Sequence, residues 1–192
     1  MMQNNFFTIE LKPETGTVKS LVMNHDPDGM NWVEGLFSWG LPADFEFVEM
    51  KSAGSEVHSF YRQETLELEV IRTLEPDRLT ERYIYRNTGY YDLYFQRGGL
   101  GIYATFNDSY PESDICIKKR CHAHIWCGGE HSYIHARKMG PFPTELALIL
   151  THGSLDSYSV ERIEQEMSND RGDFVLHPSP CHLLPGSEMV LE

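Results

Sequence analysis

The sequence has little positive charge. Sixteen lysines and arginines stand against 29 aspartates and glutamates, which gives a formal net charge of −13. Proteins bind a phosphate backbone through a basic field, and the only dense basic cluster here is Lys118, Lys119 and Arg120. We therefore exclude nucleic acid as a partner.

The sequence also lacks an apolar run near the roughly 20 residues that a membrane-spanning helix requires. Its first residues contain neither the basic stretch nor the apolar core of a signal peptide, so we expect a cytoplasmic protein with no membrane partner. A chain of 192 residues buries enough surface to fold without disulfides, so we expect its four cysteines to remain reduced thiols. We expect no cofactor.

Helical periodicity is scarce, and short alternating segments bounded by turn residues dominate the chain. The residues at 75–78 and the paired glycines in 96–99 predict two hairpin turns. The segment 25–44, rich in Gly, Pro and Trp, predicts a long irregular excursion. These features predict an all-β protein, a large antiparallel β-sandwich. The expected strands are 6–11, 17–23, 66–74, 79–87, 91–95, 100–106, 132–138, 145–151, 158–162 and 173–177.

We expect one domain over residues 1–190. The sequence "LLPGSEMVLE" enters a strand and stops there, so we interpret the chain as a fragment of a longer protein, with 191–192 a possible cloning remnant.

The stretch "RCHAHIWCGGEHSYIHARK" (120–138) concentrates cysteine and histidine. On a strand, Cys121 and Cys127 share one face, whereas His122, His124 and Trp126 share the other. This alternation separates the ligands that a structural zinc needs at one point, so we expect no metal site.

The face with the two histidines and Trp126 leaves three interpretations open. His122 and His124 are spaced to clamp a metal with one further carboxylate. An indole beside two imidazoles also suits a sugar, whose C–H groups stack on Trp while polar side chains bind its hydroxyls. A strand with a capping Trp and hydrogen-bonded surface histidines has the same pattern.

The loop "YATFNDSYPESD" (103–114) carries acids beside aromatic residues, a composition typical of functional loops and also of ordinary turns. We select Asn107, Asp108 and Tyr110 from it. Together with the strand, the candidate residues for carbohydrate binding or a domain interface are Asn107, Asp108, Tyr110, His122, His124 and Trp126.

Five segments in order carry a resemblance to a known family: "GTVKSLVMNHDPDGMNWV", "LTERYIYRNTG", "GLGIYATFNDSY", "HIWCGG" and "SNDRGDFVLHPSPCHLLPG". Over roughly residues 16–187 the chain resembles the N-terminal β-domain of bacterial glycoside hydrolase-like proteins, a galactose-mutarotase-like supersandwich that precedes an α/α toroid.

The resemblance implies a non-catalytic accessory domain that packs on a catalytic helical toroid and contributes to carbohydrate binding. Free-standing mutarotases of this fold use a His and a Glu as acid and base, which implies an alternative function as a sugar epimerase. His122 or His124 matches the first role, and no glutamate matches the second.

Overall fold

The computed structural model describes residues 1–35, 37–107, 119–160 and 173–192. Within these ranges the chain forms sixteen β-strands and no α-helix, which confirms the all-β sandwich class. None of these ranges contains a helix long and apolar enough to cross a membrane. The strands are β1 (Met2–Gln3), β2 (Phe7–Leu11), β3 (Val18–Met23), β4 (Glu46–Ala53), β5 (Glu56–Gln63), β6 (Leu66–Leu74), β7 (Leu79–Asn87), β8 (Leu93–Phe95), β9 (Ile102–Thr105), β10 (Cys121–Trp126), β11 (Tyr133–Lys138), β12 (Glu145–Ile149), β13 (Leu155–Val160), β14 (Asp173–Pro178), β15 (Cys181–Leu183) and β16 (Glu188–Leu191).

Five antiparallel strands in the order β16-β7-β6-β5-β4 form the larger sheet. Alternation specifies its inner face: Leu66, Leu68 and Val70 of β6 are at most 2% exposed because they share one side of the strand. Strands β6 and β7 span the predicted ranges, and residues 75–78 close the predicted hairpin.

The three-stranded sheet β1-β2-β3 is fastened to the larger sheet through the turn between β2 and β3. Ser59 Oγ donates to the Gly16 carbonyl at 2.8 Å, and Tyr61 Oη donates to the Thr15 carbonyl at 2.8 Å. Gly16 has φ of 64°, and a Cβ there would lie 2.6 Å from Ser59 Oγ. Only glycine therefore fits this close approach.

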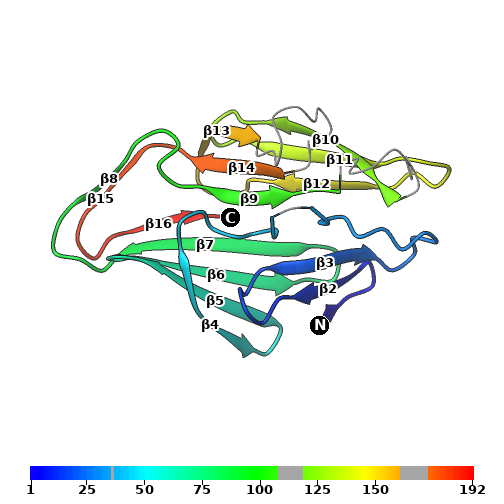
Figure 1. The fold of residues 1–192 in the computed structure, drawn as a ribbon, viewed down its shortest axis with the longest axis horizontal. Helices are drawn as coiled ribbons and strands as arrows, with labels where there is room; N and C mark the ends of the chain where they lie inside the picture. The colour runs from blue at the N-terminus through cyan, green and yellow to red at the C-terminus, as the bar shows by residue number, and fades with distance from the viewer. Residues whose placement is uncertain (36, 108–118, 161–172) are drawn as a thin grey trace.

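A second layer contains the sheets β13-β14-β9 and β10-β11-β12, and Figure 1 shows it above the five-stranded sheet. The predicted hairpin at 96–99 is wrong. Strand β8 pairs with β15 and β9 pairs with β14, so residues 93–105 run in one direction against residues 173–183. Gly98, with φ of 74°, serves a turn inside this interrupted strand rather than a chain reversal.

The segment between β3 and β4 forms only isolated bridges in its described residues, as predicted for 25–44. Trp39 pairs with Val18 of β3, and Pro42 pairs with Ile102 of β9, so the segment reaches both layers. Trp32 is 0% exposed and Trp39 is 5% exposed. These indoles fill the space between the layers.

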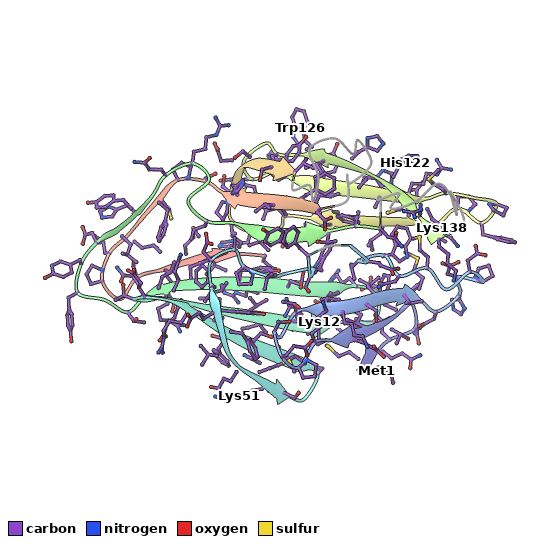
Figure 2. The ribbon with its side chains drawn as sticks, in the orientation of Figure 1. Met1, Lys12, Lys51, His122, Trp126 and Lys138 are labelled. Carbon is purple, nitrogen blue, oxygen red and sulfur yellow. The ribbon has the colours of Figure 1, made fainter. Side chains whose placement is uncertain are left out.

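A buried lysine holds the loop after β3 against the second layer (Figure 2). Lys138, in β11, has no exposed side-chain surface; its ammonium pairs with Asp26 and lies 2.7 Å from Asp28 Oδ2. Asp26 also accepts the backbone amides of Asp28 and Met30 at 3.1 and 3.0 Å. The charges are therefore paired and hydrogen-bonded, as buried charges require.

The last residues of the chain are built into the sandwich. Leu191 is 3% exposed and pairs with Tyr83 of β7. The Glu192 carbonyl accepts the backbone amide of Thr151 at 2.7 Å, which joins β16 to the second layer.

Candidate functional site

The candidate strand, β10, alternates as predicted. Cys121 is fully buried, and Ala123 and Ile125 are half-buried on the same side. His122, His124 and Trp126 are exposed on the other side. In Figure 2, Trp126 and His122 lie on the outer side of the second layer, away from the five-stranded sheet.

Pairing with β11 and β12 extends this face into three rows. In the first row Trp126 lies opposite Tyr133, which lies opposite Ile149. These side chains are 58%, 48% and 60% exposed. Three large apolar groups in a line on the surface contribute little burial to folding, so they indicate a contact surface.

The second and third rows are polar. His124 lies opposite His135, and His122 lies opposite Arg137. Glu145 of β12 ends the third row, with its carboxylate 3.3 Å from His135 Nε2 and 3.6 Å from Arg137 Nε. We call this surface the histidine face; it comprises His122, His124, Trp126, Tyr133, His135, Arg137, Glu145, Ala147 and Ile149.

The turn between β10 and β11 holds the indole in place. A Cβ on Gly128 would lie 2.4 Å from Trp126 Nε1, so the ring packs directly over this glycine. Ser132 Oγ accepts the Gly128 amide and donates to the Gly129 carbonyl, both at 3.0 Å. Gly129 also bridges to Leu155 of β13. The hydrogen bonds of this turn therefore hold the indole in position.

Asn107 does not belong to the histidine face. It is 8% exposed, and its Nδ2 donates to the Asn31 and Lys119 carbonyls at 3.0 and 2.8 Å. The buried side chain therefore has a structural role, because its amide donates to two backbone carbonyls. Asp108 and Tyr110 lie outside the described residues.

Among the described residues, Cys121 is buried, and Cys127 and Cys181 are half-buried. In these ranges Cys127 and Cys181 form no disulfide, and no group of three or more His, Cys, Asp and Glu is arranged to hold a metal. Burial raises the pKa of the Cys127 and Cys181 thiols, with Asp156 adding to the effect at Cys127. Neither environment favours a reactive thiolate.

A cavity of about 690 Å³ lies between the layers, beneath the histidine face. Ile125 and Leu148 line it from the second layer, and Trp39, Glu81 and Tyr83 line it from the other side. Both carboxylate oxygens of Glu81 are engaged, one by Arg72 Nε at 2.6 Å and the other by Trp39 Nε1 at 2.7 Å. The Glu81 carboxylate therefore has a structural role.

The sequence interpretation missed Tyr133, His135, Arg137 and Ile149. A signal for them was present: 132–138 and 145–151 were both predicted as strands, and each alternates. The register of these strands against β10 decides which of their side chains belong to the histidine face. The lengths of the turns were not enough to predict this register.

No family model matches the chain, and no curated protein matches it. A solved structure of a polysaccharide lyase matches with a TM-score of 0.83 and 26% sequence identity. The match covers 100% of this chain and 32% of that protein. The chain thus resembles, over its whole length, a β-sandwich portion of a carbohydrate-active protein, and it spans about a third of that protein's length.

Proposed function

We propose that the chain is a non-catalytic β-sandwich domain of a larger carbohydrate-active protein, and that its histidine face binds carbohydrate. The row formed by Trp126, Tyr133 and Ile149 carries the proposal, because these side chains are exposed although apolar. The similarity to a polysaccharide lyase supports the ligand class.

The chemistry of the face suits a sugar chain. Pyranose rings present C–H groups that stack on the indole and phenol rings. Their hydroxyls need donors and acceptors at the ring edge, which the second and third rows supply as imidazole, guanidinium and carboxylate groups. Trp126 and Tyr133 lie opposite each other on neighbouring strands, so consecutive sugar units can contact the two rings.

The parent protein supplies the second partner. The chain corresponds to 32% of the matching lyase. A parent protein of similar organisation therefore has most of its residues outside this sandwich. We propose that the sandwich packs against a catalytic helical domain of that parent and presents carbohydrate to it.

Affinity gel electrophoresis with a panel of soluble neutral and anionic polysaccharides tests the binding role. Trp126→Ala should weaken retardation at least about tenfold, equivalent to about 1.4 kcal/mol, and Trp126→Phe should retain most of it. Phe6→Ala is the control, since Phe6 is 51% exposed and lies between β1 and β2, outside the histidine face. Equal retardation of Trp126→Ala and wild type would overturn the proposal.

Epimerase activity is the competing function, and the geometry does not favour it. The nearest histidine and glutamate on the face, His135 and Glu145, contact each other on an open surface instead of flanking a ring-sized pocket. We expect no acceleration of aldose anomer interconversion by the chain, followed by NMR. Acceleration lost in His135→Ala or His124→Ala would establish the epimerase instead.

A further inference from the structure

A second group of exposed aromatic residues lies outside the histidine face. Tyr90, Tyr91 and Tyr94 are 94%, 84% and 69% exposed. They follow β7 and enter β8, which Figure 1 places at the left end of the molecule. Rings with this much exposed surface add little to folding, so another role keeps them at the surface.

The loop that carries these rings is firmly held. Asn87 is 0% exposed, and its Nδ2 donates to the Tyr91 and Leu183 carbonyls at 2.9 and 3.0 Å. Its Oδ1 accepts the Gly89 amide at 3.0 Å. The amide and hydroxyl of Thr88 both donate to the Thr65 carbonyl at 2.9 Å. A buried polar side chain thus preorganises the loop, which lowers the entropy cost of binding.

Next to the loop, the carboxylate of Asp92 contacts a stacked pair of aromatic rings. Tyr94 lies opposite His182 in the β8–β15 pair, and their rings stack at 4.2 Å with 12° between planes. Asp92 Oδ2 lies 2.9 Å from His182 Nε2 and accepts from Tyr94 Oη at 3.5 Å. The carboxylate orients both rings.

We propose that Tyr90, Tyr91, Asp92, Tyr94 and His182, here called the tyrosine tip, form a second carbohydrate-binding site, specific for neutral sugar units. Flat rings stack on sugar C–H faces, and the hydroxyl, imidazole and carboxylate edges bind sugar hydroxyls. Rings and polar edges alternate within the tip, which suits a ligand with both kinds of surface better than an apolar protein face.

The neutral preference follows from charge. Asp92 contributes a carboxylate to the tip beside Tyr94 and His182, on a chain with a net charge of −13, so a uronate would meet like charge. The inference rests on the proposed function for its ligand class, but it concerns a different surface.

Two-dimensional ¹H–¹⁵N NMR of the chain tests the tip, with cellohexaose, mannohexaose and hexagalacturonate as probes. We expect at least one neutral hexasaccharide to shift the amides of 89–94 and 181–184, and hexagalacturonate to shift them much less. The shifts should persist in Trp126→Ala. In Tyr91→Ala and Tyr94→Ala the dissociation constant at the tip should rise about tenfold. Phe6→Ala is again the control.

The outcomes separate this inference from the proposed function. Shifts of the Trp126 indole without shifts at 89–94 and 181–184 would overturn the tip and leave the histidine face standing. If no probe shifts the amides of either surface, both the tyrosine tip and the proposed function are overturned. Shifts at the tip that depend on protein concentration in the absence of sugar would identify a second copy of the chain as the occupant and overturn the inference.

Discussion

Arg72 and Glu81 lie opposite each other on β6 and β7 and form an ion pair of 2.6 Å in the interior. Their side chains are 0% and 8% exposed. Arg72 also donates to the Gly16 carbonyl, and Glu81 accepts from Trp39. Burial alone would lower the pKa of Arg72, but Glu81 and neighbouring tyrosines raise it above its ordinary value. One ion pair therefore joins the five-stranded sheet to two other segments.

Glu81→Gln should destabilise the fold strongly. The substitution leaves the Arg72 guanidinium buried without its carboxylate, and a broken buried pair typically costs about 3–5 kcal/mol. Urea unfolding followed by tryptophan fluorescence gives the free energy of unfolding. Glu67→Gln is the matched control, because Glu67 pairs with Arg62 on the surface at 2.8 Å and should contribute no more than about 1 kcal/mol. Equal costs at the two positions would contradict the structural role of Glu81.

Acid should weaken the attachment of the loop after β3. Burial raises the pKa of Asp26, but hydrogen bonds from Lys138 and from the Met30 and Asp28 amides outweigh burial and hold the pKa below its ordinary value of 3.8. A carboxyl with a depressed folded pKa contributes stability above its unfolded pKa and loses it as pH falls through the folded pKa.

We therefore expect wild type to be more stable than Asp26→Asn at pH 7, with the difference shrinking below about pH 4. Urea midpoints measured from pH 7 to pH 2 report the difference. Glu49→Gln, which removes the exposed partner of Lys51, should differ little from wild type throughout. A constant gap between Asp26→Asn and wild type down to pH 2 would show that Asp26 acts without its charge.

The purified chain should hold no structural zinc. Cys121 points into the core while His122 and His124 point outward, so these potential ligands do not converge. Elemental analysis after purification without added metal should give well under one equivalent. A stoichiometric metal whose removal by a chelator unfolds the chain would reverse this conclusion.

Local patterns predicted the elements that depend on local signals. Strand β6 alternates along most of its nine residues, and four turn residues separate it from β7, so the bounds of this hairpin could be predicted from the sequence. Strands β4 and β5 were not predicted, although Gly54 marks their turn and β5 alternates. Strand β4 exposes most residues on both sides and alternates weakly, so it gave no clear signal for the hairpin. The paired glycines at 98–99 suggested a hairpin, but long-range pairing with β14 and β15 decided the path of the chain.

Only part of the candidate site could be predicted from local sequence patterns. Strand periodicity predicted that His122, His124 and Trp126 share an exposed face. Neighbouring strands supplied Tyr133, His135 and the rest of the surface, and composition could not place Asn107 inside the fold. The polar composition of its loop predicts an exposed side chain, yet its amide donates to the Asn31 and Lys119 carbonyls.

Trp126 should contribute little to folding and much to recognition. The indole is 58% exposed, so Trp126→Ala should cost about 1 kcal/mol of unfolding free energy. Ile134, on the next strand, is 2% exposed and faces the core, so Ile134→Ala should cost about 2–5 kcal/mol.

Urea unfolding of both variants, paired with polysaccharide retardation at a temperature where both remain folded, separates the two roles. Trp126→Ala should lose binding with nearly unchanged stability, because stacking aromatics concentrate binding energy. Ile134→Ala should keep binding while folded, since its side chain points away from the histidine face. If Trp126→Ala unfolds the chain while Ile134→Ala does not, the indole is a core residue and the histidine face is not the recognition surface.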